Sequence, residues 1–321
     1  MAEIAVIGAG YVGLTTGACF SHLGHHVVCV DNVKSKVETL SRGQVSIVEE
    51  GLEDLVQAGV SGNTLRFTSD TQAGVSSADY VFLCFPTPDL PNGSVDMSYV
   101  DAVATQIGPW LRAGAVVINK STVPVGTTSH VAQLLGRDDV FVVSNPEFLR
   151  EGNAVTDFLN PSRVVVGGDN AGAVERVAKL YDGTNAPVIR CDATSAETIK
   201  YAANAFLETK ISFINSIASI CEHLGADVRV VANAIGRDPR IGAQFLQPGP
   251  GFGGSCFPKD TIGLVRLAEE AGYDFGVLKS VIEANDQQLA RTVAKGPQCS
   301  GRVASGCCSR RVGTDLQGEY R

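Results

Sequence analysis

A glycine pattern near the start of the chain constrains the fold more than any other feature. Gly8, Gly10 and Gly13 form G-x-G-x-x-G between the apolar run 3–7 and a helical stretch, and Asp31 closes a second apolar run. In dinucleotide-binding folds the first glycine makes the turn, the second admits a pyrophosphate and the third packs helix against strand. A glycine-rich turn in another α/β protein is the alternative, but the flanking elements and the acidic residue favour a dinucleotide site. The motif residues expected to contact the cofactor are Gly8, Gly10, Tyr11, Val12 and Gly13.

Asp31 and two nearby lysines bear on which dinucleotide is bound. A carboxylate at the end of the second strand accepts hydrogen bonds from a ribose diol and repels a 2′-phosphate, which favours NAD over NADP. Lys34 and Lys36 follow closely in the sequence, and a cation there would accommodate that phosphate. We expect the carboxylate to dominate, with Asp31 and Lys36 both in the cofactor site.

Apolar runs alternate with longer amphipathic stretches over roughly the first 190 residues. Such runs are typical of strands buried on both faces of a sheet, and helical stretches between them imply right-handed crossovers. The pattern predicts an α/β fold with a Rossmann-like, doubly wound parallel sheet. The expected strands are 3–7, 27–31, 79–85, 115–119, 140–144, 163–167 and 187–191.

The pattern changes near Ser195 to a helical period without glycine or proline before Gly225. Thr194 or Ser195 is the expected cap, and Gly225 suits the left-handed position that ends a helix. A helix of about 30 residues is unusually long and typically connects domains or forms a subunit interface. Two further helices are expected near 260–271 and 275–295. The expected organisation is an NAD-binding domain at 1–193, a helical central and dimerisation domain at 194–296, and an irregular tail at 297–321.

Charge and hydropathy exclude several classes of protein. The 321 residues carry a net charge of -8, with 44% hydrophobic and 19% charged residues, which is an ordinary globular composition. Neither nucleic acid nor an anionic membrane is an expected partner of such an acidic chain. The first residues lack a basic leader and no run reaches the about 18 apolar residues of a membrane span, so we expect a cytoplasmic protein. His22, His25 and His26 have no carboxylate or thiol at ligand spacing, so no metal site is expected.

One of the nine cysteines stands in a setting suited to chemistry. Cys256 lies in the glycine-rich segment 248–260, directly before an expected helix and close to Lys259. A helix N-terminus and a neighbouring cation both lower a thiol's pKa and favour the nucleophilic thiolate. With a dinucleotide fold, such a thiol suggests oxidation of an aldehyde through a thioester, although a structural cysteine in a glycine-rich turn stays possible. Five others lie in apolar patterns typical of small buried hydrophobes, namely Cys19, Cys29, Cys84, Cys191 and Cys221.

Six motifs are spread along residues 1–296. They are VIGAGYVGL, FPTP at 85–88, KSTVPVGTT at 120–128, NPEFLREG at 145–152, IKYAANAFLETKISFINSIA at 199–218, and DPRIG with FLQPGPGFGGSCFPKD at 238–260. Together, and in this order, they resemble the UDP-glucose/GDP-mannose dehydrogenase family. The segment GFGGSCFPKD with Arg240 upstream is similar to the UDP-glucose branch, while GDP-mannose and amino-sugar dehydrogenases are similar in the rest of the chain.

This resemblance implies a four-electron oxidation of a sugar C6 alcohol to a carboxylate with two NAD. Cys256 would capture the aldehyde as a thiohemiacetal and carry it as a thioester that water hydrolyses. Lys200 would stabilise the alkoxide or oxyanion, and Asn204, one helical turn further, would share that task. Asp260 and Thr122 would hold a water, with Glu147 as the general base of thioester hydrolysis.

The resemblance also implies binding residues and partners. The further cofactor contacts are Thr87, Thr122, Glu151 and Lys259. The implied sugar site consists of Glu147, Phe148, Leu149, Arg150, Glu151, Lys200, Asn204, Phe245, Leu246, Gln247, Pro248, Gly249 and Gly253. Arg240 would reach the substrate across a dimer interface. The implied partners are UDP-glucose or a related nucleotide sugar and a second copy of the chain, in a homodimer formed through the long helix.

The end of the chain departs from the family's pattern. The family continues with a second Rossmann-like, UDP-binding domain that opens with a motif like LGLTFKANTDD, whereas residues 297–321 show neither a helical nor a strand period. One permitted codon choice for Val312 to Arg321 and a following stop codon, read one nucleotide later, encodes Leu-Gly-Leu-Thr-Phe-Lys-Ala-Asn-Thr-Asp. We therefore hypothesise a frameshift near 295–301, which resequencing tests, and expect this chain to turn over UDP-glucose poorly.

Two alternative functions stay open on the sequence alone. In the first alternative, the chain is a catalytically impaired, NAD-binding remnant of such an enzyme. In the second it is a 3-hydroxyacid dehydrogenase, which shares a Rossmann-like domain followed by a long helix. That second alternative explains residues 1–225 but not GFGGSCFPKD, because its chemistry needs no thiol nucleophile.

Overall fold

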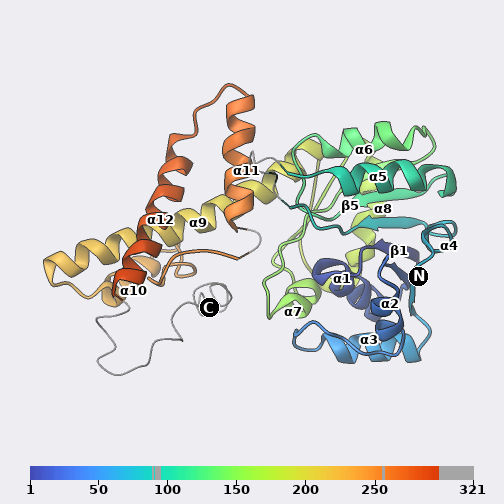
Figure 1. Cartoon of the computed structure of the whole chain (residues 1–321), viewed down its shortest axis with the longest axis horizontal. Coiled ribbons are helices and arrows are strands. Elements are labelled where there is room, and N and C mark those ends of the chain that lie inside the picture. The colour runs from blue at the N-terminus through green and yellow to red at the C-terminus, as the bar shows by residue number, and fades with distance from the viewer. Residues whose placement is uncertain (89, 91–94, 255–256, 296–321) are drawn as a thin grey trace. The chain divides into compact units, whose positions relative to one another are not determined.

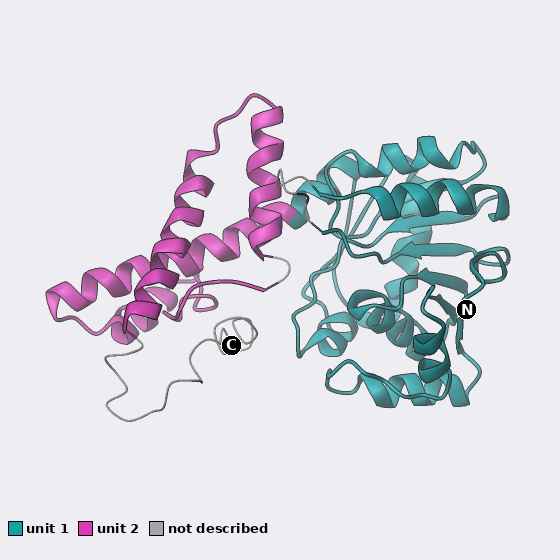
Figure 2. Cartoon of the chain, viewed as in Figure 1, with its two compact units in different colours: residues 1–90, 95–200 teal, residues 91–94, 201–321 magenta. Residues whose placement is uncertain are grey.

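A computed structural model describes residues 1–88, 90, 95–254 and 257–295. It divides into two compact units, the first made of residues 1–90 and 95–200 and the second mainly of residues from Tyr201 onward (Figure 2). Cys256 and the tail at 297–321 lie outside the described residues, so the predictions for both stay predictions.

The first unit is built on one eight-stranded sheet in the order β3-β2-β1-β4-β5-β6-β7-β8 (Figure 1). Neighbouring strands are parallel except β6 and β7, which pair antiparallel through Ser144 and Gly167. With β1 between β2 and β4, this order confirms the predicted Rossmann-like fold. The strands are β1 (Glu3–Ile7), β2 (His26–Val30), β3 (Leu65–Thr68), β4 (Tyr80–Leu83), β5 (Val116–Asn119), β6 (Phe141–Ser144), β7 (Val164–Gly167) and β8 (Val188–Cys191).

Two features of the sheet were not predicted. β3 lies at the sheet edge and contains the exposed Arg66, so its four residues form no continuous apolar run. The reversal at β7 escaped prediction because an apolar run marks a buried strand without giving its direction. The edge position of β8 also explains why Cys191 is half-exposed, against the prediction that it is buried, whereas Cys19, Cys29, Cys84 and Cys221 are buried as predicted.

Helices cover both faces of this sheet. They are α1 (Tyr11–His22), α2 (Lys34–Ser41), α3 (Leu52–Ser61), α4 (Thr71–Val75), α5 (Ser98–Ile107), α6 (Thr127–Leu135), α7 (Ala154–Leu159) and α8 (Ala171–Ala178), with short 3-10 helices at Gly108–Trp110 and Lys179–Thr184. Figure 1 shows α5 and α6 on one face, and α1, α3 and α7 on the other. Each face therefore has its own apolar core, as a sheet buried on both sides requires.

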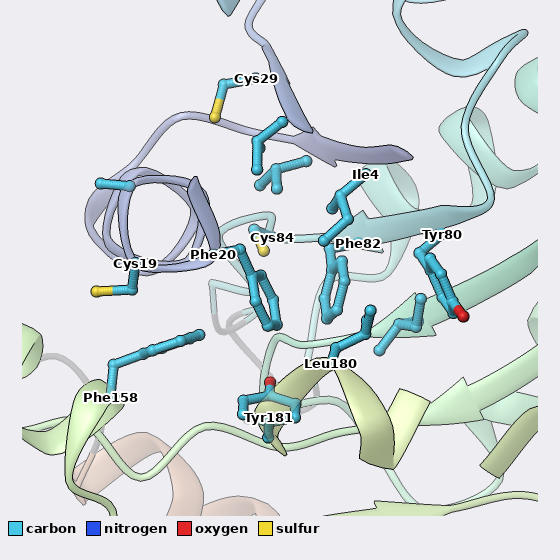
Figure 3. Close-up of a cluster of buried hydrophobic side chains, with 14 of the residues drawn as sticks. Ile4, Cys19, Phe20, Cys29, Tyr80, Phe82, Cys84, Phe158, Leu180 and Tyr181 are labelled. Carbon is cyan, nitrogen blue, oxygen red and sulfur yellow. The ribbon is translucent and has the colours of Figure 1, made fainter. Parts of the chain in front are cut away.

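An aromatic group lies at the centre of the larger core (Figure 3). The ring centroid of Phe20, on α1, lies 5.1 Å from that of Phe82, 5.0 Å from Phe158 and 5.1 Å from Tyr181. Edge-on and tilted contacts at these distances are the preferred arrangement of aromatic side chains. They fix α1, which carries the glycine motif at its start, against β4, α7 and the segment after α8.

The second unit is helical. The long helix α9 (Ala193–Leu224) begins in the first unit, and α10 (Val228–Gly236), α11 (Phe257–Glu270) and α12 (Gly276–Lys295) follow. The predicted cap at Thr194 or Ser195 is wrong: Asp192 accepts hydrogen bonds from the Ser195 backbone N–H and hydroxyl, so the helix begins earlier. Gly225 has the predicted left-handed backbone, with φ 70°. No helix in the described part of the chain has the length and apolar character needed to cross a membrane.

Candidate active site

The turn after β1 has the backbone that the glycine motif predicts. Gly8 has a φ of 95°, and a Cβ there would lie 2.3 Å from the Cys84 carbonyl oxygen, so only glycine fits. A Cβ at Gly13 would lie 1.8 Å from the Gly8 carbonyl oxygen, whereas a Cβ at Gly10 would meet no atom within 4 Å. The turn thus packs tightly against the sheet and leaves open space beside the N-terminus of α1, where a pyrophosphate fits.

Asp31 follows β2 and is held by several donors. Its Oδ2 accepts hydrogen bonds from the Ala9 backbone N–H at 3.0 Å and from Lys36 Nζ at 2.7 Å, and Oδ1 accepts from the Val33 N–H at 3.0 Å. Partial burial would raise the pKa of Asp31, but the bonds from Lys36, Val33 and Ala9 outweigh it and hold the pKa below its usual value. Asp31 is therefore a fixed carboxylate beside the glycine turn, and Lys36 neutralises it directly.

Lys200 and Glu147 form a buried ion pair within the first unit. Lys200 Nζ, on α9, donates to Glu147 Oε1 at 2.9 Å, and the two side chains are 6% and 7% exposed. Glu147 comes three residues after β6, and its Oε2 accepts the Leu149 backbone N–H at 2.7 Å. Burial would raise the pKa of Glu147, but Lys200, the Leu149 N–H and Lys120 outweigh it and lower the pKa. Glu147 is thus an ionised carboxylate that balances the Lys200 ammonium, as a buried charge requires.

A second buried lysine, which the sequence analysis passed over, lies at the end of the neighbouring strand. Lys120 directly follows β5, and its Nζ donates to Asn145 Oδ1 at 3.1 Å and to the Tyr181 hydroxyl oxygen at 3.2 Å. The Nζ also lies 5.8 Å from the Phe158 ring centroid and 5.7 Å from that of Tyr181. Burial, opposed in part by the charge of Glu147, lowers the pKa of Lys120 to about 8.

Thr87 and Thr122 are joined at the carboxyl ends of β4 and β5. The Thr87 hydroxyl donates to the Thr122 carbonyl oxygen at 2.9 Å, and both side chains are buried. The carboxyl ends of parallel strands are where open α/β sheets bind ligands. The structure therefore brings these two predicted residues together at the expected edge, where Lys120 follows β5 and Glu147 follows the neighbouring β6.

Glu49 connects the start of α1 to the segment after Glu147. Its Oε2 accepts the Tyr11 hydroxyl at 2.6 Å and the Gly152 backbone N–H at 2.9 Å, and its Oε1 accepts the Ala154 N–H at 2.6 Å. The Tyr11 hydroxyl also lies 3.2 Å from the Arg150 carbonyl oxygen. One carboxylate thus holds Tyr11, a predicted cofactor residue, and the backbone at Gly152 and Ala154, just after the predicted substrate residues 147–151. No sequence motif indicated Glu49.

The remaining side chains of the segment 148–152 differ in exposure. Arg150 forms an ion pair with Asp157, with Nη2 to Oδ1 at 2.5 Å, while Glu151 is exposed. The Arg163 guanidinium stacks 3.9 Å from the Phe148 ring centroid, and Lys200 Nζ lies 5.5 Å from the same centroid. Two cations therefore lie against the Phe148 ring.

In the second unit, Asn204 and Asp260 form a buried pair. Asn204 Nδ2, on α9, donates to Asp260 Oδ2, on α11, at 2.6 Å, and Lys259 Nζ lies 2.8 Å from Asp260 Oδ1. The Asn204 and Asp260 side chains that form this hydrogen bond are both buried. The prediction that Asp260 and Thr122 share a water concerns residues of different units and stays a prediction.

Side-chain amides hold the backbone of the glycine-rich loop after α10. Asn215 Oδ1 accepts the Gly249 N–H at 2.8 Å, and Gln288 Nε2 donates to the Gly249 carbonyl at 2.7 Å. Asn285 accepts the Phe252 N–H at 2.8 Å and donates to its carbonyl at 3.1 Å. A loop whose backbone is fixed in this way offers groups of defined position, which is the role predicted for it.

The other predicted residues of this loop lie in varied settings. Phe245 has a φ of 63° and Leu246 is buried, while Gln247 is exposed and Pro248 and Gly253 are partly exposed. Arg240 lies on the surface, 87% exposed, paired with Asp238 at 2.6 Å. Within the described ranges no three His, Cys, Asp or Glu side chains gather as metal ligands.

Comparison with known proteins identifies the family. Residues 2–185 match the NAD-binding domain of the UDP-glucose/GDP-mannose dehydrogenase family, and residues 194–287 match its central domain. The chain belongs to the UDP-glucose/GDP-mannose dehydrogenase family. The prediction from the six motifs is confirmed, and the predicted cofactor with it, because the matched domain is the family's NAD-binding domain.

Several similar proteins are named as UDP-glucose dehydrogenases. The chain is 48% identical over 300 residues to the UDP-glucose 6-dehydrogenase TuaD of Bacillus subtilis, covering 92% of this chain and 65% of that protein. It is 45% identical over 296 residues to a UDP-glucose 6-dehydrogenase of Rhizobium meliloti, covering 89% and 68%. A UDP-glucose dehydrogenase structure from Pyrobaculum islandicum superposes with a TM-score of 0.88 at 38% identity, covering 93% of this chain and 72% of that one. The chain spans about two thirds of the length of these curated relatives.

Proposed function

We propose that this chain oxidises the C6 alcohol of UDP-glucose to the carboxylate of UDP-glucuronate. The observation that carries the proposal is the buried Lys200–Glu147 pair, which lies at the carboxyl ends of the strands in a domain of the NAD-binding family. A cation that is fixed before substrate arrives is suited to stabilise an oxyanion. The names of the curated relatives support UDP-glucose as the substrate.

The cofactor fits the glycine turn and Asp31, and when bound it supplies the acceptor for a hydride in each oxidation. In the first oxidation the alcohol also loses its hydroxyl proton to solvent, and the Lys200 ammonium stabilises the alkoxide from which the hydride leaves. Asn204 donates its amide N–H toward the same oxygen in our proposal. Since Asp260 already accepts one of that amide's protons, the direction of the other is set.

The second oxidation passes through Cys256, whose role rests on the sequence because it lies outside the described residues. Its thiolate adds to the aldehyde carbon and the oxygen gains a proton, which gives a thiohemiacetal. Loss of a hydride and of that proton gives the thioester. Water then adds to the thioester carbonyl, Glu147 accepts one of its protons and solvent takes the other, and the C–S bond breaks to release carboxylate and thiolate. The start of α11 at Phe257 supports this proposal, because a helix N-terminus stabilises a thiolate.

Turnover of the 321-residue chain with UDP-glucose, which we expect to be slow, tests the proposal. Two NADH should form for each UDP-glucuronate, followed by NADH absorbance and product analysis, and Cys256→Ala should abolish acid formation. Cys191→Ser, which changes a half-exposed cysteine of β8, is the matched control. Oxidation of GDP-mannose or UDP-N-acetylmannosamine in place of UDP-glucose would contradict the substrate, and acid formation by Cys256→Ala would contradict the nucleophile.

We also propose that two copies associate through α9. Four large apolar side chains lie at intervals of seven, seven and four residues along this helix, and each is more than half exposed: Phe206, Phe213, Ile220 and Leu224. Residues at these intervals share one helical face, and an exposed apolar stripe of this kind marks a protein interface. The stripe runs along one long helix, so the same stripe on the α9 helix of a second copy has the right length and apolar character to pack against it.

The mass of the chain in solution tests this association. The native chain should sediment as a dimer. Phe213→Glu should give a monomer, because each copy would then place a negative charge in the interface and the two charges would repel each other. Glu283→Lys, an exposed change on α12, is the control. A monomeric native chain would contradict the dimer, and an unchanged KM of Arg240→Ala in a dimeric chain would contradict the proposed reach of Arg240 to the partner's substrate.

A further inference from the structure

Beside Asn204 and Asp260, a second pair of polar side chains joins α9 to α11, and it has no role in the proposed reaction. Glu208, one helical turn after Asn204, accepts a hydrogen bond from the hydroxyl of Thr261, the residue after Asp260. The Glu208 and Thr261 side chains are both 0% exposed. The two helices are therefore joined by two adjacent polar contacts, one at a proposed catalytic pair and one directly behind it.

The surroundings of Glu208 favour a neutral carboxylic acid. Its Oε1 has no hydrogen-bond partner among the described residues, and a buried carboxylate with an unpaired oxygen is far more costly than the acid. The charged group that faces it from α11 is Asp260, whose own cation, Lys259, lies on the opposite oxygen of that carboxylate. Burial raises the pKa of Glu208 to about 8, with the Thr261 bond opposing and the Asp260 charge adding to the rise.

Apolar side chains complete this environment. The core of the second unit next to this contact contains Ile211 from α9, Val265 from α11, and Leu278 and Val281 from α12. None of these groups titrates or carries charge, so they supply no compensation for an ionised Glu208. Any charge on Glu208 therefore acts mainly on Asp260.

We propose that Glu208 is a positioning residue for the Asn204–Asp260 pair, and that it performs this role only while its carboxyl is protonated. In the acid form it holds α11 against α9 through Thr261. Loss of its proton to solvent places a second carboxylate beside Asp260, and repulsion separates the two helices where α11 begins. The contact between the helices is independent of the proposed function, whereas its effect on turnover rests on that function.

Hydrogen exchange of the α11 amides tests the contact without any substrate. Because the folded chain holds the Glu208 proton more tightly than the unfolded chain, the resulting stability is complete below the unfolded-state pKa and is lost as pH rises toward about 8. Relative to Glu208→Gln, which is neutral at every pH, the opening constant of α11 should rise about tenfold per pH unit from about pH 4.5 and level off above about pH 8. Parallel curves for the two proteins would overturn the proposal.

Two further variants and a control sharpen this experiment. Thr261→Val removes the bond that lowers the pKa of Glu208, so the levelling should move to higher pH, and Thr261→Ser should restore the native curve. Glu270→Gln, an exposed change at the end of α11, should follow the native curve. A Thr261→Val curve that coincides with the native one would overturn the role of the hydroxyl.

Turnover of UDP-glucose across the same pH range then tests the positioning. The native kcat should fall on the alkaline side with a midpoint near pH 8, while the midpoint for Glu208→Gln should lie about one pH unit higher or more. Coinciding alkaline limbs would overturn the positioning role. If no variant turns over at any pH while the exchange curves differ as expected, the proposed function is wrong and the protonated contact stands.

Discussion

Replacing Lys120 by methionine should change how the stability of the first unit depends on pH. In the folded chain burial lowers the pKa of Lys120 from 10.5 to about 8, so its proton is lost near pH 8. The unfolded chain keeps that proton until about pH 10.4. Between these values the unfolded state binds more protons, and raising the pH therefore favours the folded state.

The size of this effect follows from the two pKa values. A lowering from 10.5 to about 8 corresponds to about 3 kcal/mol, at 1.36 kcal/mol for each pH unit. The native chain should therefore gain about 3 kcal/mol of stability, relative to Lys120→Met, as the pH rises from about 8 to about 10.5. At pH 7 the variant should be at least as stable as the native chain, because the Tyr181 hydroxyl still donates to Asn145 Oδ1 at 2.5 Å.

Denaturant unfolding followed by tryptophan fluorescence measures this difference. The single tryptophan of the chain, Trp110, lies in the first unit, so its signal reports the unfolding of the unit that contains Lys120. Lys179→Met, an exposed change in the same unit, is the control and should run parallel to the native chain. A difference between the native chain and Lys120→Met that stays constant with pH would refute the reasoning.

Three further predictions concern the glycine turn, Asp31 and Lys200. Gly10→Ala should keep native stability, because its Cβ meets no protein atom, but should lose NAD affinity. Gly13→Ala should also lose about 1–3 kcal/mol of folding stability, because its Cβ would lie 1.8 Å from a carbonyl oxygen. Calorimetric titration with NAD and thermal unfolding separate the two effects. Asp31→Asn should raise the ratio of NADP to NAD affinity by about tenfold or more, since the repelling charge is removed; equal ratios by titration would contradict this. Lys200→Met should destabilise the first unit by about 3–5 kcal/mol by leaving Glu147 buried and unpaired, and adding Glu147→Gln should recover part of it; an unchanged unfolding midpoint in the single variant would count against the ion pair.

Local patterns predicted the parts of the site that depend on local geometry. The glycine turn at Gly8, the acidic residue at Asp31 and the left-handed end of α9 at Gly225 each follow from the conformational needs of a few neighbouring residues. The motif resemblance predicted the family and the residues Glu147, Lys200, Asn204 and Asp260. Contacts between distant residues were not predicted: Glu49 and Gly152 are 103 residues apart, and Glu208 and Thr261 are 53 apart.

Lys120 shows which signal would have found one of the missed residues. Asn119 and Ser144 are paired in the register of β5 and β6, so the residues that follow them, Lys120 and Asn145, must emerge side by side at the same edge. A polar residue directly after each of two buried runs was visible in the sequence. The adjacency of β5 and β6 was needed to join them, and an apolar run does not state its neighbours.

Spacing along a helix determines which residues share a face, but their partners determine which of them carry charge. Lys200, Asn204 and Glu208 occur at intervals of four on α9, so the sequence alone places them on one side of the helix. Lys200 contacts a carboxylate that balances its charge, whereas Glu208 contacts a hydroxyl and faces the charge of Asp260. A buried carboxyl in the second setting keeps its proton at neutral pH, although in the sequence it is only another acidic residue of a long helix.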